Sequence, residues 1–156
     1  MEPFERVVDQ HGAVVLRVCR ALVGADAAQD AWSETFLAAL VAYPRLRPDS
    51  DVRAWLVTIA HRKAVDVLRA QARRAVPVAD PPEPPSSGEH PGDGRADVWA
   101  AVAALPPKQR RCVAYHHVAG LPYDEVAALV GGTPAAARRA AADGIATLRR
   151  TWEEAS

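Results

Sequence analysis

Residues 121–150 read LPYDEVAALVGGTPAAARRAAADGIATLRR, and this stretch predicts two helices joined by a tight turn. Apolar residues at helical spacing place the first helix over 123–130. Gly131-Gly132 ends it, because glycine adopts left-handed dihedrals without a steric cost. Thr133 is expected to cap the second helix, with Pro134 at the first helical position, where its missing N–H does no harm.

The second helix has an apolar side and a basic side. Residues that recur at steps of four and three share one helix face, and here these are Ala137, Ala141, Ile145, Leu148 and Trp152. Arg139 lies opposite that face and Arg138 lies at its edge. Small residues beside arginines let a helix backbone approach an anion, which is the layout of a DNA-binding helix-turn-helix. An αα-hairpin packed inside an all-α domain is the alternative, and this pattern alone does not exclude it.

Composition and charge restrict the possible functions. The chain has 156 residues, 49% of them hydrophobic, and its many alanines and arginines favour helix. No apolar run is long enough to cross a bilayer and the acidic start is no signal peptide, so we expect a cytoplasmic protein with no membrane partner. Cys19 and Cys112 are expected to be buried free thiols. The formal net charge of zero predicts weak non-specific DNA affinity for the isolated chain.

No motif supports catalysis, a metal site or a cofactor. The chain has no phosphate-binding glycine loop, nucleophile elbow or zinc-ligand spacing. His116 and His117 are adjacent, so on a helix they would point about 100° apart and could not easily share a metal. Helical periodicity already explains the positions of His61 and Asp66, and of His116 and Cys112, so neither pair indicates catalysis. We therefore expect no catalytic residue, metal, cofactor or small-molecule substrate.

The order of elements predicts an all-α fold with two small helical domains. Three helices are expected over Phe4–Val23, about 27–43 and about 51–74. Proline, glycine, serine and acidic residues dominate 76–95, which predicts a flexible linker between domains 1–75 and 96–156. The second domain ends in the helix-turn-helix.

Two helices of the first domain carry candidate surfaces. Over 27–43, Trp32, Phe36, Leu37 and Leu40 are expected to face inward, while Asp30 and Glu34 share an exposed face. The helix over 51–74 is the most basic in the chain and includes Trp55. Basic residues interleaved with an aromatic suit single-stranded nucleic acid as well as duplex. Ordinary surface charge on a helical bundle is the alternative for both surfaces.

Three motifs, in this order, resemble an extracytoplasmic-function sigma factor of bacterial RNA polymerase. They are DAWSETFLAAL (30–40), DVRAWLVTIAHRKAVDVLR (51–69) and LPPKQRRCVAYHHVAGLPYDEVAALVG (105–131). The resemblance spans nearly the whole chain apart from the linker. It implies a non-enzymatic subunit that directs core polymerase to specific promoters and assists promoter melting.

The resemblance also implies partners and site residues. Asp30 and Glu34 would dock on the clamp helices of the largest polymerase subunit, the second domain would contact the flap, and an anti-sigma factor would be a further partner. The minus-ten promoter element would be held by Arg45, Arg47, Asp49, Ser50, Arg53, His61, Arg62, Lys63 and Arg69. The minus-thirty-five element would be read in the major groove by Thr133, Ala135, Ala136, Arg138 and Arg139. Trp55 would serve packing rather than DNA contact.

The chain departs from the family pattern in its DNA-reading helices. Arg62 stands where the family usually carries asparagine, and residues 136–144 are mostly alanine where the family has polar or basic residues. Gly144, inside the expected recognition helix, should cost about 1 kcal/mol relative to alanine. Either few side chains read the minus-thirty-five element, or this domain binds another partner such as an anti-sigma factor. A two-domain helix-turn-helix regulator that acts without polymerase is the alternative function, although a duplex-only regulator has no use for a basic melting surface.

Overall fold

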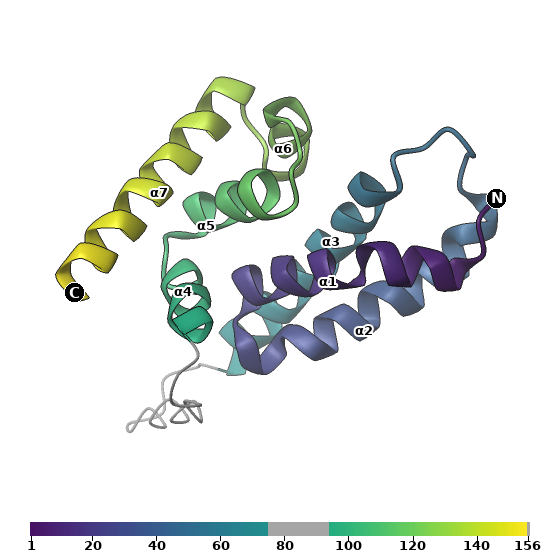
Figure 1. The fold of residues 1–156 in the computed structure, drawn as a ribbon, viewed down its shortest axis with the longest axis horizontal. Coiled ribbons are helices and arrows are strands. Elements are labelled where there is room, and N and C mark those ends of the chain that lie inside the picture. The colour runs from purple at the N-terminus through teal and green to yellow at the C-terminus, as the bar shows by residue number, and fades with distance from the viewer. Residues whose placement is uncertain (75–93, 156) are drawn as a thin grey trace.

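The computed structural model describes residues 1–74 and 94–155, and within these ranges the chain is built of helices and connecting turns without a strand (Figure 1). The expected all-α fold class is confirmed. The first domain holds α1 (Phe4–Val23), α2 (Ala25–Ala42), a 3₁₀ turn (Tyr43–Arg45) and α3 (Val52–Arg74). The second domain holds α4 (Gly94–Ala103), α5 (Pro107–Val113), a π-helical turn (Ala114–Val118), α6 (Tyr123–Val130) and α7 (Pro134–Ala155). The predicted linker over 76–95 lies outside the described residues except for its last two positions, which already belong to α4.

The first three helices pack around an aromatic and aliphatic core. The Trp32 and Phe36 rings lie 4.6 Å apart between centroids, and the Trp32 Nε1–H donates to the Gly12 carbonyl across 2.9 Å. This bond satisfies the indole donor inside the core, which a buried tryptophan requires. Trp55 is half-buried and packs beside Tyr43, as expected for a packing residue.

The inward face of α2 is lined by small residues rather than by leucines. Its buried positions include Ala28, Ala31, Thr35 and Ala39, which allow α1 and α3 to approach closely. The prediction that Leu37 and Leu40 face inward is wrong, because their side chains are 60% and 51% exposed. At 100° per residue, Leu37 lies about opposite the alanine face. Close packing of α2 against α1 and α3 leaves room mainly for small side chains on that face.

The second domain packs its helix-turn-helix against α5. Ala137, Ala140 and Ala141 of α7 are buried, and the predicted apolar face continues through half-buried Ile145 and Leu148. Trp152, expected on the same face, is 51% exposed, because α7 extends past the helices it packs on. Cys112 is a buried free thiol at this contact and Cys19 is another in the first domain, both as predicted.

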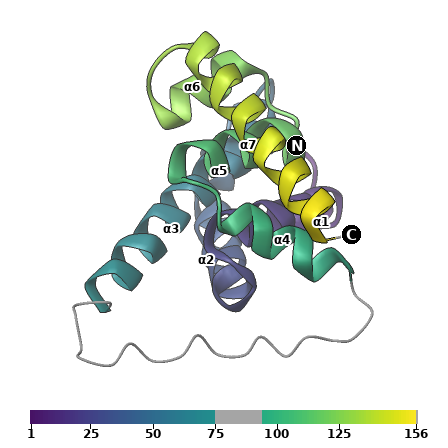
Figure 2. The same cartoon turned by 90° about the vertical axis from the view of Figure 1, so that its left-hand side faces the viewer.

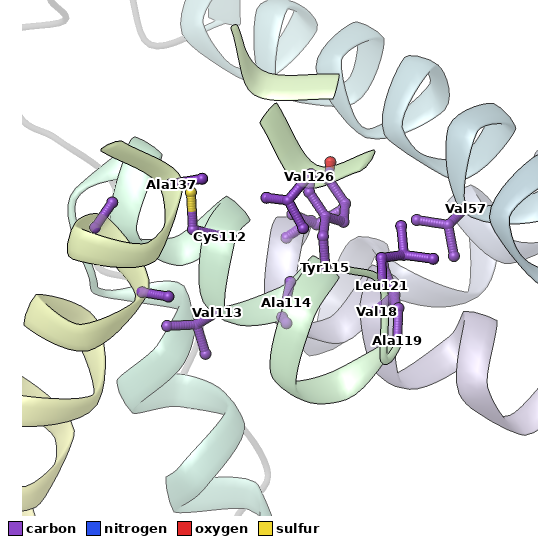
Figure 3. Close-up of a cluster of buried hydrophobic side chains, with 14 of the residues drawn as sticks. Val18, Val57, Cys112, Val113, Ala114, Tyr115, Ala119, Leu121, Val126 and Ala137 are labelled. Carbon is purple, nitrogen blue, oxygen red and sulfur yellow. The ribbon is translucent and has the colours of Figure 1, made fainter. Parts of the chain in front are cut away.

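The two domains share one hydrophobic core. Val18 and Leu22 of α1 and Val57 of α3 join the same buried cluster as Tyr115 and Leu121 of the second domain (Figure 3). Figures 1 and 2 both show α4 and α5 lying against the first domain.

Polar contacts close the same interface. The Arg110 guanidinium donates through Nη1 to the Leu22 carbonyl at 3.2 Å across the interface, and to the Ala103 carbonyl at 3.3 Å within the second domain. The Tyr115 hydroxyl, which is fully buried, bonds to Nδ1 of His61 on α3. These bonds satisfy polar groups that the interface removes from water.

Candidate functional site

The turn of the helix-turn-helix follows the predicted chemistry. Gly131 and Gly132 have φ angles of 87° and 84°, in the left-handed region that favours glycine. The Ala136 amide N–H donates to the Thr133 hydroxyl oxygen across 3.1 Å, so Thr133 caps α7 with Pro134 at its first position. Both local predictions are confirmed, and the turn fixes the direction in which α7 leaves α6.

The start of α7 presents the residues assigned to the minus-thirty-five element. Thr133, Ala135, Arg138 and Arg139 are exposed, while Ala136 is half-buried. Because Ala137, Ala140 and Ala141 are buried on the other side, Arg139 projects from the free face of the helix and Arg138 from its edge. A 22-residue helix adds the positive end of its dipole at this point, which favours an anionic partner.

Arg138 belongs to a stack of three side chains. Its Cζ lies 5.2 Å from the centroid of the Tyr123 ring. The His116 ring stacks on Tyr123 with centroids 3.8 Å apart and planes 15° from parallel. Nδ1 of His116 lies 2.8 Å from the Leu121 carbonyl, to which it donates, and this bond fixes the orientation of the imidazole. The stack therefore joins the π-helical turn, α6 and α7.

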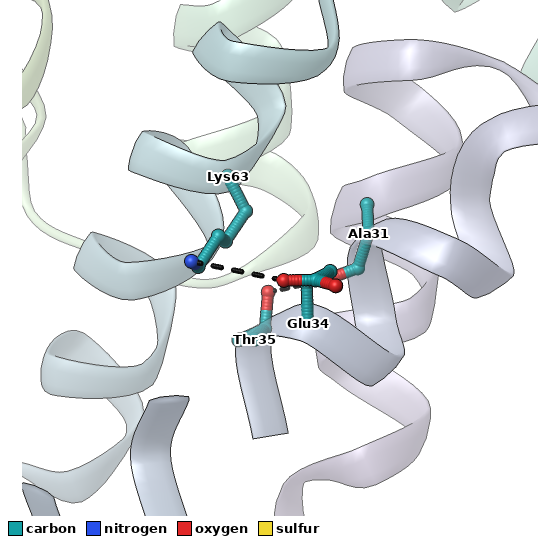
Figure 4. A network of polar contacts seen from close by, with 4 residues as sticks. All are labelled: Ala31, Glu34, Thr35 and Lys63. Atoms are coloured by element: carbon teal, nitrogen blue, oxygen red, sulfur yellow. Dashed lines mark hydrogen bonds and ion pairs between the residues drawn. The ribbon is translucent and has the colours of Figure 1, made fainter. Parts of the chain in front are cut away.

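The outer face of α2 combines carboxylates with apolar side chains. Asp30, Glu34, Leu37 and Val41 follow steps of four, three and four residues, so they share one face, and Leu40 lies on its flank. All five are exposed, Val41 at 80%. We call these five residues the outer α2 face. Glu34 also contacts Lys63 of α3 at 3.9 Å, a long and solvent-exposed ion pair that contributes little stability (Figure 4).

The residues assigned to the minus-ten element lie on the loop before α3 and along α3 itself. Six of them are exposed: Arg45, Arg47, Asp49, Arg53, Arg62 and Arg69. Ser50, His61 and Lys63 are half-buried. Asp51 caps the start of α3, since its Oδ1 accepts from the Ala54 amide N–H across 3.1 Å.

Two of these nine residues are already engaged within the chain. Lys63 contacts Glu34, and His61 is bonded to Tyr115 of the second domain. Burial lowers the pKa of His61 below its ordinary value, and the nearby Arg111 and Arg62 lower it further. The arrangement therefore holds a neutral imidazole at the domain interface, where the sequence had suggested a DNA contact.

Three features of these surfaces were absent from the sequence prediction. Tyr123 and Tyr115 were not assigned roles, and Leu37 with Val41 was not recognised as a continuation of the acidic face. The spacing 30, 34, 37, 41 contains that last signal. No comparable signal marks the Tyr123 stack, because it joins three separate segments.

In ranges 1–74 and 94–155, no group of three or more His, Cys, Asp or Glu side chains is placed to hold a metal ion. In the same ranges, no helix has both the length and the apolar character needed to cross a membrane.

Sequence comparison assigns known regions to both domains. The family model for Sigma-70 region 2 matches residues 7–74, and that for Sigma-70, region 4 matches residues 95–148. ECF RNA polymerase sigma factor SigD of Mycobacterium tuberculosis (strain ATCC 25618 / H37Rv) is 34% identical over 148 residues, which cover 86% of this chain and 70% of SigD. RNA polymerase sigma factor CarQ of Myxococcus xanthus is 32% identical over 131 residues, covering 81% of this chain and 75% of CarQ.

Solved structures share the fold at low sequence identity. CnrH, solved in complex with the cytosolic domain of CnrY, aligns with a TM-score of 0.66 and 23% identity over 98% of this chain and 89% of CnrH. The sigma factor RpoE of Bartonella quintana, solved in complex with the anti-sigma factor NepR, aligns with a TM-score of 0.72 and 19% identity over 96% of this chain and 98% of RpoE.

Proposed function

Since this chain belongs to the extracytoplasmic-function RNA polymerase sigma factors of the sigma-70 family, we propose that it docks on core polymerase through the outer α2 face and reads promoter DNA with α3 and α7. Its task is to direct core polymerase to specific promoters and to assist their melting. Polymerase would supply most of the DNA affinity, which accounts for a formal net charge of zero.

The observation that carries the docking proposal is the composition of the outer α2 face. Leu37, Leu40 and Val41 are more than half exposed, although burying a large aliphatic side chain gains about 1.5–3 kcal/mol. A contiguous exposed apolar patch beside charged residues is typical of a protein-binding surface. Asp30 and Glu34 at one end of the patch fit a basic partner, and the polymerase clamp helices are the partner that family membership suggests.

Binding of the full chain to core polymerase tests this docking. We expect Asp30→Lys with Glu34→Lys, and separately Leu37→Ser with Val41→Ser, each to weaken the affinity at least about tenfold. The matched control reverses Glu5 and Asp9, two exposed acids four residues apart on α1 and therefore outside this face. Far-UV circular dichroism should be the same for all variants. Unchanged affinity of both outer-face variants, with duplex binding retained, would favour a regulator that acts without polymerase.

The DNA-reading part of the proposal rests on the exposed cations of two domains. The loop before α3 and α3 itself present six exposed residues, five of them arginines, for the minus-ten element. The start of α7 presents two more arginines for the minus-thirty-five element. An anti-sigma factor is proposed as a further partner, since RpoE, which shares the fold, was solved with one.

Simultaneous reading of both elements requires the domains to separate. The elements are centred about 25 base pairs apart, which is roughly 85 Å of duplex at ~3.4 Å per base pair. A compact chain of 156 residues has a radius of gyration of only about 15 Å, so the packed arrangement is too short to span that distance. Energy transfer between dyes on Ala13→Cys and Ala142→Cys, both at exposed positions, should be high in the free chain and fall on binding core polymerase. Transfer that stays high in an active holoenzyme would contradict the separation.

A further inference from the structure

Tyr123 is held between two side chains from other segments. The His116 ring covers one face of the phenol at 3.8 Å, so the Arg138 guanidinium, 5.2 Å from the same centroid, lies over the other face. The imidazole cannot swing away freely, because its Nδ1 is bonded to the Leu121 carbonyl at 2.8 Å. Tyr123 is itself half-buried, which leaves the phenol little room to move.

Arg138 is exposed, and the ring is its defined partner. Across the described part of the chain, no carboxylate lies within ion-pair distance of its guanidinium. A long arginine side chain on a surface ordinarily samples many rotamers, and a cation over an aromatic face restricts that freedom. A guanidinium that uses its flat face for stacking keeps the N–H donors at its edge for other bonds.

We infer that Tyr123 is a positioning residue for DNA contact, holding the Arg138 guanidinium ready to bind a backbone phosphate beside the first turns of α7. This inference rests on the proposed function, in which α7 enters the groove. The phosphate is favoured over a base because Arg138 lies at the edge of the free face, tied back toward α6. Arg139, further from the packed face, is left to reach the base edges.

We predict that the effects of Tyr123 and Arg138 substitutions on the free energy of promoter binding are coupled, which packing alone would not produce. In reconstituted holoenzyme, we expect Tyr123→Leu to weaken binding to a promoter duplex by about two- to fivefold, for all minus-thirty-five sequences alike. The slope of the logarithm of the binding constant against the logarithm of the salt concentration should not change, since the Arg138 charge is still present. Tyr123→Phe keeps the aromatic face and should bind like wild type. Arg138→Ala should reduce the slope by about one unit.

Double variants separate positioning from packing. Tyr123→Leu should have no further effect in an Arg138→Ala background and its full effect in an Arg139→Ala background. Equal weakening by Tyr123→Leu in all three backgrounds would overturn the inference and leave the tyrosine a packing residue. Wild-type affinity of Tyr123→Leu, while Arg138→Ala weakens binding, would overturn it too but leave DNA reading by α7 standing. If neither arginine variant alters promoter binding, DNA reading by α7 itself fails, and the inference with it.

Discussion

Gly144→Ala should destabilise the protein, although alanine is the better helix former. Intrinsic propensity favours alanine by about 0.8–1.0 kcal/mol at an interior helix position. Gly144 is buried where α7 crosses α5, however, and a Cβ added there would stand 2.7 Å from Val113 Cγ2. The optimum separation of two carbons is about 3.5–4.0 Å, so the added methyl would overlap the valine by roughly 1 Å.

The surroundings decide the size of the effect. Val113 is 3% exposed and β-branched, so in a helix it has one strongly preferred rotamer and cannot turn aside cheaply. The new methyl would also stand 3.4 Å from Leu105 Cδ1 and 3.5 Å from the Gln109 Cβ. Overpacking of this kind costs about 1–3 kcal/mol, and the rigid neighbours place it in the upper part of that range. After subtracting the propensity gain, we expect a net loss of about 1–2 kcal/mol in the free energy of unfolding.

Urea denaturation of four variants, Gly144→Ala, Ala146→Gly, Val113→Ala and the Val113→Ala/Gly144→Ala double variant, tests the predicted clash. Ala146→Gly, at an exposed position two residues further along α7, should lose about 1 kcal/mol through propensity alone. Gly144→Ala in a Val113→Ala background should become stabilising, because the overlapping Cγ2 is gone. If Gly144→Ala stabilises the otherwise unchanged chain, α5 and α7 leave room for the added methyl beside Val113, which contradicts the 2.7 Å separation.

Three further predictions concern DNA reading, the linker and pH. Arg139→Ala should cost about 1–3 kcal/mol in promoter binding and relax the preference at one base pair; a promoter-mutation profile identical to wild type would contradict a base contact. Replacing Pro77–Gly94 by a Gly/Ser chain of equal length should retain substantial initiation in a transcription assay, and loss of activity with both domains folded would reveal specific linker contacts. Below pH 6.5 the unfolded chain protonates His61 while burial keeps its folded pKa lower, so the free energy of unfolding should fall as pH drops below that point. Urea midpoints at about pH 7.5 and 5.5 measure this fall in stability. His61→Gln should make the fall smaller but should not abolish it, because burial lowers the pKa values of His11 and His117 as well.

Residues that end or cap a helix made the bounds of several helices predictable from the sequence. Helices Phe4–Val23 and Tyr123–Val130 have the predicted bounds, because Gly24 and Gly131 end them through positive φ angles that other residues avoid. The Thr133 cap was predictable for the same reason, since it depends only on neighbours in sequence. These features involve no distant part of the chain.

Features that depend on packing between helices were not predictable in this way. Of the four large residues predicted to face inward on α2, Trp32 and Phe36 do so, whereas Leu37 and Leu40 are exposed. The closeness of α1 and α3 selects Ala28, Ala31 and Ala39 for the remaining inward positions. From the sequence, Gly144 was expected only to destabilise the helix relative to alanine. The reason for a glycine there, the close approach of Val113, lies on another helix and cannot be seen in the local sequence. The bond between His61 and Tyr115 joins residues 54 apart, and the π-helical turn at Tyr115 also shifts the helical register on which periodicity depends.

The core shared by the two domains has a thermodynamic consequence under the proposed function. If polymerase binds only the separated form, its apparent affinity equals its intrinsic affinity multiplied by the fraction of chains that are open. The interface then sets a threshold: each 1.4 kcal/mol by which it favours the packed form demands about ten times more free polymerase for the same occupancy. Leu22 and Tyr115, both buried in that core, would thus influence how strongly the promoter responds to a given amount of the protein.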